Sequence, residues 1–183
     1  MAYDAGLRDF GENRVQEALG KIENLPADIR WHLIGQLQTN KINKVIGEFT
    51  LIHSVDSIHL ARALSARLGD GTQEILLEVN TSGEQSKSGL SPEMALDSAQ
   101  EISKLSGLKL RGLMTVGPLT KSIPQQRAAF QRLKGLFEEM RQKIWAGRAF
   151  SILSMGMSGD FETAIEEGSS LVRIGTAIFG GRA

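Results

Sequence analysis

The alternation of short apolar runs with longer amphipathic segments is the feature that most constrains the fold of this chain. Several of the short runs are apolar almost throughout, as in parallel strands that are buried on both faces. Seven such strands are predicted, at residues 8–13, 31–37, 51–55, 74–80, 110–116, 150–157 and 171–179. Strands that alternate with helices in this way predict a parallel α/β fold.

Helical signals fill the segments between these runs. Ser91 followed by Pro92 is typical of a helix start. A stripe of apolar side chains at helical spacing predicts one long helix with an inner face in the core, formed by Phe130, Leu133, Phe137, Met140 and Ile144. Residues 2–5 with Gly6 behind them are typical of the last turn of a helix and its C-terminal glycine.

Both an open doubly wound sheet and a closed (β/α)8 barrel fit this order of elements. The barrel is favoured because no G-x-G-x-x-G turn follows an early strand. Polar groups suited to a ligand also gather after the last two strands, where barrels commonly place a phosphate site. We therefore expect a TIM-type barrel in which seven strands are visible, the first is missing, and a seam lies open between the first and last of the seven.

Composition limits the classes of function. The 183 residues include 21 basic and 21 acidic ones, so net charge offers no general reason to bind nucleic acid or an anionic membrane. The absence of cysteine excludes disulfides and zinc–thiolate sites, and the three histidines lack metal-site spacing. With no apolar run of membrane length and no signal peptide in the first residues, we expect one cytoplasmic domain over 1–183.

The segment 154–160 joins a predicted strand to a short predicted helix at 161–167. Gly156 and Gly159 permit backbone conformations and close approach that larger residues would block. Ser158 offers a hydroxyl beside the free N–H groups of a helix start, which favour an anion. The alternative is an ordinary turn in which Ser158 or Asp160 is the helix N-cap.

The segment 172–180 carries an arginine, Arg173, inside an apolar strand, where it is costly unless paired or bound to a ligand. Gly175 and Thr176 follow at once and offer a backbone N–H and a hydroxyl. In a barrel this segment lies beside 154–160, so the two together favour a phosphate cradle.

Other polar residues have two readings each. Asn13, after the first strand, either reaches a ligand or caps the next helix. His32 and His53 lie within apolar strands, where a hydrogen-bonded core histidine is more common than a catalytic base. Lys87, in a polar loop, either meets an anion or is simply solvated.

Motifs in family order across the chain resemble the pyridoxal 5′-phosphate (PLP) homeostasis family, the single-domain PLP-binding barrels related to the barrel of bacterial alanine racemase. The matching segments are residues 8–13 (RDFGEN), 31–41 (WHLIGQLQTNK), 86–89 (SKSG), 111–114 (RGLM), 154–158 (SMGMS) and 172–180 (VRIGTAIFG). Each motif is modest alone, whereas the ordered set is specific.

The resemblance implies a role for five residues. Ser158 and the pair Gly175-Thr176 would hold the PLP phosphate, Arg173 would face the pyridine nitrogen, and Asn13 would lie near the cofactor. A permanent cation beside that nitrogen disfavours its protonation and weakens the ring as an electron sink. The implied function is therefore vitamin B6 homeostasis by a PLP-binding protein that is not an enzyme.

The resemblance also implies a Schiff-base lysine on the first strand, in a motif similar to Ala-Val-Ser-Lys, which this sequence does not contain. Since none of the seven predicted strands contains a lysine, and Lys41, Lys44 and Lys87 lie on a helix or loop, we expect weak, non-covalent PLP binding. Expected partners are PLP and PLP-dependent apoenzymes as its recipients, with a monomer or weak homodimer as the assembly.

Two other functions remain open on the sequence. A racemase-like PLP enzyme would need a lysine base and usually a tyrosine from a partner domain, and the chain's single tyrosine is Tyr3. A barrel remnant without cofactor, acting through protein interaction, would keep the fold but lose PLP binding.

Overall fold

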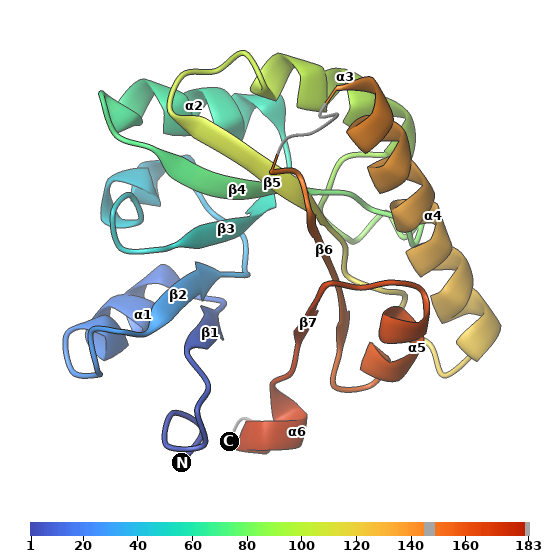
Figure 1. Ribbon diagram of the computed structural model, residues 1–183, viewed down its shortest axis with the longest axis horizontal. Coiled ribbons are helices and arrows are strands. Elements are labelled where there is room, and N and C mark those ends of the chain that lie inside the picture. Colours follow the sequence, from blue (N-terminus) through green and yellow to red (C-terminus); the bar gives the residue numbers. More distant parts are fainter. Residues whose placement is uncertain (145–148, 182–183) are drawn as a thin grey trace.

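Seven parallel strands form one curled sheet in the computed structural model, which describes residues 1–144 and 149–181. The strands are β1 (Asp9–Glu12), β2 (Arg30–Leu33), β3 (Leu51–Val55), β4 (Gln73–Glu78), β5 (Leu108–Met114), β6 (Ile152–Met157) and β7 (Leu171–Arg173). Each pairs in parallel with the next along the chain, so β1 and β7 are the two edges (Figure 1). The predicted TIM-type barrel with seven visible strands and an open seam is confirmed.

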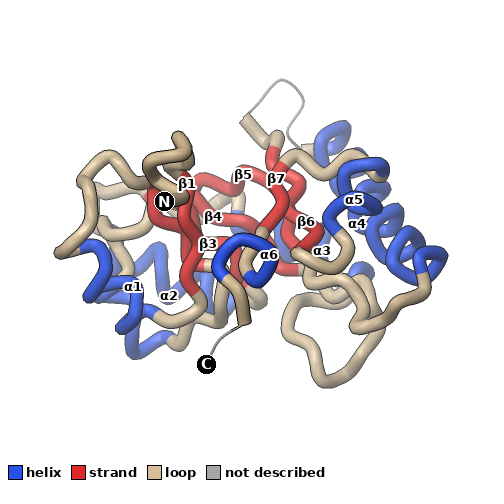
Figure 2. The backbone as a smooth tube through the Cα atoms, turned by 90° about the horizontal axis from the view of Figure 1, so that it is seen from below, coloured by secondary structure: helices blue, strands red, loops and turns tan. Residues whose placement is uncertain are grey.

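Except for the last one, which follows β7, the helices connect successive strands around the outside of the sheet (Figures 1 and 2). They are α1 (Val15–Ile22), α2 (Ile58–Leu68), α3 (Pro92–Ile102), α4 (Ile123–Lys143), α5 (Phe161–Glu166) and α6 (Thr176–Phe179), with a 3-10 helix at Thr39–Lys44. Pro92 is the first residue of α3, as predicted. None of the helices in the described part of the chain combines the length and the apolar character that crossing a membrane requires.

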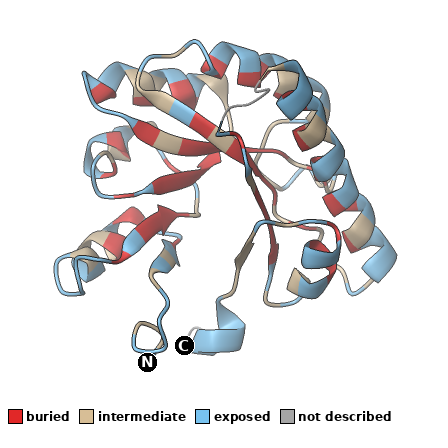
Figure 3. Cartoon of the chain, in the orientation of Figure 1, coloured by how far each residue is buried: buried red, intermediate tan, exposed pale blue. Residues whose placement is uncertain are grey.

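The two faces of the sheet are buried in different ways. On the outer face, a large apolar cluster fills the space between strands and helices, and four predicted members of the α4 stripe, Phe130, Leu133, Phe137 and Met140, are buried in it. On the inner face, the buried apolar cluster consists of Leu51, Leu76 and Met114. Figure 3 shows burial concentrated in the middle strands and on the inner sides of the helices. The barrel interior therefore has room for polar side chains.

The last predicted strand, 171–179, is wrong beyond Arg173. The strand ends there, and residues 176–179 form the single turn α6, in which the N–H groups of Ile178 and Phe179 donate to Gly175 O at 2.9 Å. The apolar composition is typical of a strand, but Ile178 and Phe179 are exposed rather than packed in a sheet. The predicted strand at 31–37 likewise ends early, at Leu33.

The first residues form the predicted helix-end turn. Gly6 has φ +96° and donates its N–H to Tyr3 O at 2.9 Å, while Leu7 N–H donates to Ala2 O at 3.2 Å. This pair of bonds is the pattern that closes a helix C-terminus around a glycine.

Candidate functional site

The packing of α5 on the end of β6 depends on one of the two glycines in the segment 154–160. Gly156 has φ +93°, and a Cβ on it would lie 2.5 Å from the Cβ of Ala164 in α5. Only glycine therefore allows α5 to pack this closely on the strand. A Cβ on Gly159 would meet nothing within 4 Å, so the prediction for that residue gains no support.

Ser158 faces the start of α6 rather than capping α5. Its Oγ accepts the backbone N–H of Gly175 at 3.2 Å and that of Ala177 at 3.3 Å. The N-cap of α5 is Asp160, whose Oδ1 accepts the Met157 N–H at 2.6 Å. The alternative in which Ser158 is the N-cap is therefore wrong.

Gly175 and Thr176 lie on the open side of this contact. A Cβ on Gly175 would have nothing within 4 Å, and Thr176 is exposed as the first residue of α6. Two backbone N–H groups thus converge on one oxygen at the mouth of the barrel. The same pair of donors could be accepted by a phosphate oxygen in place of the Ser158 hydroxyl.

Arg173 holds a fixed position inside the barrel, two residues before Gly175. Its Nη1 donates to Ser154 Oγ at 2.7 Å, and its Nη2 donates to the backbone oxygen of Thr115 at 2.8 Å. Burial lowers the pKa of Arg173 to about 10, and the carboxylates of Glu78 and then Asp160 oppose that shift. The guanidinium is therefore a cation at neutral pH that is already oriented by two acceptors.

His32 and His53 form a hydrogen-bonded pair in the barrel interior, as the commoner reading of the sequence predicted. His32 Nδ1 lies 3.0 Å from His53 Nε2, and His53 Nδ1 lies 3.1 Å from Ser154 Oγ. Burial lowers the pKa of His32 and, more strongly, that of His53, which His32 and Arg173 lower further. Both rings are accordingly neutral at pH 7.

Glu78 brings a carboxyl group to the same region from the end of β4. It is 6% exposed. Burial and then the charge of Asp56 raise the pKa of Glu78 to about 7, with Arg173 acting in the opposite direction. This carboxyl therefore titrates near neutrality within the field of the Arg173 cation.

Asn13 lies after β1, at the other edge of the sheet. The N-cap of α1 is Arg14, so the capping alternative for Asn13 is wrong. A Cβ on Gly35 would lie 2.2 Å from Asn13 O, which means that the loops after β1 and β2 touch through backbone. Asn13 is exposed at the carboxyl ends of the strands, the side of the barrel on which Ser158 also lies.

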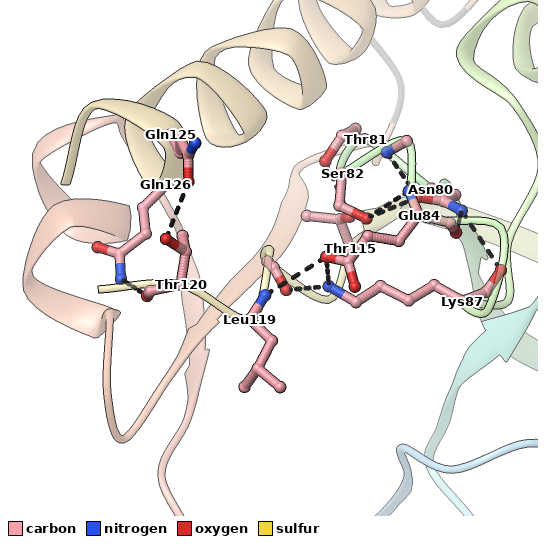
Figure 4. Close-up of polar contacts among 12 residues, drawn as sticks. Asn80, Thr81, Ser82, Glu84, Lys87, Thr115, Leu119, Thr120, Gln125 and Gln126 are labelled. Atoms are coloured by element: carbon pink, nitrogen blue, oxygen red, sulfur yellow. Dashed lines mark hydrogen bonds and ion pairs between the residues drawn. The ribbon is translucent and has the colours of Figure 1, made fainter. Parts of the chain in front are cut away.

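Lys87 is not a solvated loop residue, because its side chain bonds to its own loop and to the loop after β5. Its side chain is 17% exposed, and its Nζ donates to Glu84 Oε1 at 2.8 Å and to Gly117 O at 2.6 Å (Figure 4). A cavity of about 450 Å³ lies beside this loop, against the start of α4; its lining includes Thr81, Glu84, Leu119, Thr120 and Arg132 but none of the five predicted site residues.

The structure thus brings Ser158, Gly175, Thr176 and Arg173 to one corner of the barrel, with Asn13 across the seam. Sequence reasoning missed Ser154, Thr115 and Glu78, which contact Arg173 or act on its charge. A polar residue facing inward on an apolar strand was the available signal. Within residues 1–144 and 149–181, no group of His, Asp and Glu side chains is arranged to hold a metal ion.

Sequence and structure comparisons agree with one another. The chain matches the family "Alanine racemase, N-terminal domain" over residues 1–183. It is 43% identical to the pyridoxal phosphate homeostasis protein of Aquifex aeolicus, over 98% of this chain and 79% of that protein. For the protein of the same name from Pseudomonas aeruginosa, identity is 45% over 99% of this chain and 77% of the relative.

The structure of PipY from Synechococcus elongatus with PLP bound superposes with a TM-score of 0.86 at 36% identity, covering 98% of this chain and 84% of PipY. Alanine racemase from Clostridium difficile shares the fold, with a TM-score of 0.83 at 14% identity over 99% of this chain and 49% of the enzyme. The chain therefore belongs to the pyridoxal phosphate homeostasis protein family, within the wider alanine racemase N-terminal domain family.

Proposed function

We propose that this protein binds PLP and takes part in vitamin B6 homeostasis without catalysing a reaction of its own. One observation carries the proposal: two backbone N–H groups converge on Ser158 Oγ at the strand end next to a partly buried, pre-oriented Arg173. An anionic group and a ring with an acceptor atom would occupy these two positions together. The PLP-bound structure of the relative PipY supports the same ligand.

The phosphate is assigned to Ser158, Gly175 and Thr176. The Gly175 and Ala177 N–H groups turn from the serine hydroxyl to phosphate oxygens, and the hydroxyls of Ser158 and Thr176 add donors. The open space over Gly175 leaves the approach free of side chains. Asn13 lies near the cofactor from the β1 side.

Arg173 is assigned to the pyridine nitrogen. Bound PLP supplies a ring that withdraws electrons from a substrate, most strongly when its nitrogen is protonated. A guanidinium cation at that nitrogen opposes protonation, which supports carriage of the cofactor over catalysis. A racemase-like activity is correspondingly disfavoured.

Within residues 1–183, the contacts that we propose for PLP are non-covalent. In the strands of the described residues the lysine present is Lys109, because β5 begins at Leu108, earlier than the predicted residue 110. Lys109 is exposed near the amino end of β5, away from Ser158 and Arg173. Residues 1–183 would act as one binding unit, a monomer or weak homodimer in the cytoplasm, with PLP-dependent apoenzymes as recipients.

The test is a titration of the purified 183-residue chain with PLP, followed by absorbance, and then borohydride reduction and intact-mass measurement. We expect a near-ultraviolet PLP band without a covalent adduct, and loss of the band in Arg173→Ala and Thr176→Ala. Thr72→Ala is a matched control, since Thr72 is an exposed threonine preceding β4, at the opposite end of the strands. A stoichiometric adduct on one lysine contradicts non-covalent attachment, and absence of any band contradicts PLP binding.

A further inference from the structure

A continuous series of hydrogen bonds crosses the barrel interior from Arg173 to Asp9. Arg173 Nη1 lies 2.7 Å from Ser154 Oγ, which lies 3.1 Å from His53 Nδ1. His53 Nε2 lies 3.0 Å from His32 Nδ1, and His32 Nε2 lies 3.2 Å from Asp9 Oδ1. The members come from β7, β6, β3, β2 and β1, so the series links both edge strands through the inside of the sheet.

With both imidazoles neutral, the chemistry of the two end groups fixes the direction of donation. A guanidinium only donates, so Ser154 Oγ accepts from Arg173 and its own proton goes to His53 Nδ1. His53 then carries its proton on Nε2 and donates to His32 Nδ1. The Arg30 side chain donates to Asp9 at 2.7 and 2.5 Å and lowers the Asp9 pKa, so this carboxylate accepts from His32 Nε2.

Two other proton arrangements satisfy the same contacts, and each requires one charged imidazole. In both, Ser154 accepts from Arg173 and from His53 Nδ1; the charged ring, His32 in one and His53 in the other, donates from both of its nitrogens. Burial lowers the pKa of His32 despite Asp9 and lowers that of His53 well below its usual value, which favours the arrangement with two neutral rings at pH 7. The surrounding charges are Arg30 and Glu74 near His32, and Glu78 and Asp160 near Arg173.

We infer that Ser154, His53 and His32, ending on Asp9, form a directional hydrogen-bond chain that orients Arg173 for the ring nitrogen of PLP. The inference rests on the proposed function for its ligand. Ser154 removes the rotational freedom of Nη1, and Thr115 O, at 2.8 Å from Nη2, fixes the plane of the guanidinium. The three side chains are positioning residues, since they act on PLP through Arg173.

The first measurement needs no cofactor. We expect ¹⁵N chemical shifts of the imidazoles in the cofactor-free protein at pH 7 to show His32 and His53 neutral, each with its proton on Nε2. A proton on Nδ1 of His53, or a charged His32, overturns the direction of the chain. This result stands whether or not the protein binds PLP.

The second measurement separates positioning from structural support. We expect Ser154→Ala to weaken PLP binding about tenfold while leaving the affinity for inorganic phosphate unchanged, because the phosphate contacts lie on Ser158 and α6. Amide shifts of Gly175 and Ala177 report both titrations. Ser154→Thr, which keeps the hydroxyl, should restore PLP binding, and Ser169→Ala is the control for loss of a nearby partly buried hydroxyl.

Equal losses for PLP and phosphate, or an unchanged PLP affinity in Ser154→Ala, overturn the positioning role. If the wild-type chain binds phosphate but not PLP, the proposed function and the assignment of Arg173 to the pyridine nitrogen are both overturned. The imidazole ¹⁵N shifts still test the direction of donation along the hydrogen-bond chain in that case. If Ser154→Ala does not fold, His53→Gln is titrated in its place, with the same expectation of a loss for PLP alone.

Discussion

Gly175 donates its backbone N–H to the Ser158 hydroxyl over 3.2 Å, and this contact joins the loops that follow the last two strands. The two residues are 17 positions apart in the sequence. Each belongs to a motif that an ordinary turn would explain by itself, whereas their contact places donors of both motifs around one oxygen.

Ser158→Ala should weaken binding of PLP by about tenfold, because a phosphate loses one hydroxyl donor and the geometry that gathers the two N–H groups. Pyridoxal, which lacks the phosphate, should bind the variant and the wild type equally. Fluorescence titration with both ligands measures the difference. A similar loss for pyridoxal would place the effect of Ser158 outside phosphate binding.

Gly35→Ala should destabilise the protein by roughly 1–3 kcal/mol, because the new Cβ would overlap Asn13 O. Urea unfolding measures this change. Gly20→Ala is the matched control: Gly20 lies within α1 with nothing within 4 Å, so alanine there should be neutral or stabilising. Equal stability of both variants would contradict the close approach of the loops after β1 and β2.

Glu78→Gln should make the free energy of unfolding less sensitive to pH. The folded-state pKa of Glu78 is raised from 4.5 to about 7, so between these values the unfolded chain has released a proton that the folded protein retains. The contribution of Glu78 to the free energy of unfolding of the wild type therefore decreases as pH rises from about 4.5 to 7, by up to roughly 3 kcal/mol.

Glutamine cannot ionise, so the variant should be more stable than wild type at pH 8 and similar to it at pH 4. Urea unfolding across that range measures the difference, and Glu48→Gln, at an exposed position, is the control. A constant difference between Glu78→Gln and wild type at all pH values would contradict the raised pKa.

Thr115→Val should cost roughly 1–3 kcal/mol of stability while leaving PLP affinity unchanged. The buried Thr115 hydroxyl donates to Val79 O at 2.7 Å and lies 3.0 Å from Thr81 Oγ1, and valine leaves both without this partner. Arg173 contacts the backbone oxygen of Thr115, which valine retains. Thermal unfolding and PLP titration of the same variant check both parts, and a loss of PLP binding would contradict the assignment.

The order of elements was predictable because each strand and helix carries its own local pattern. The stripe from Phe130 to Met140 has helical spacing, and all four members that lie in α4 are buried. The last predicted strand went wrong because Ile178 and Phe179 are apolar but exposed, a property that composition does not reveal.

The corner formed by Ser158, Gly175 and Arg173 was predictable from motif order, since adjacent parallel strands end on the same side. The hydrogen-bond partners of Arg173 were not predictable from the sequence. Ser154 and His53 are 101 positions apart and meet only because β6 and β3 face each other across the curled sheet. Such a contact depends on the curvature of the sheet, which no local spacing encodes.

The difference in polarity between the two buried sides of the sheet has a consequence for how such a chain can change over evolution. Outward-facing strand residues such as Ile52 and Leu153 lie in the large apolar cluster, whereas their neighbours His53 and Ser154 point to the polar interior. Mutations at the outward-facing positions therefore act mainly on the stability of the fold, and mutations at the inward-facing positions act mainly on ligand binding. A barrel built in this way can acquire a new specificity one inward residue at a time while its scaffold is preserved.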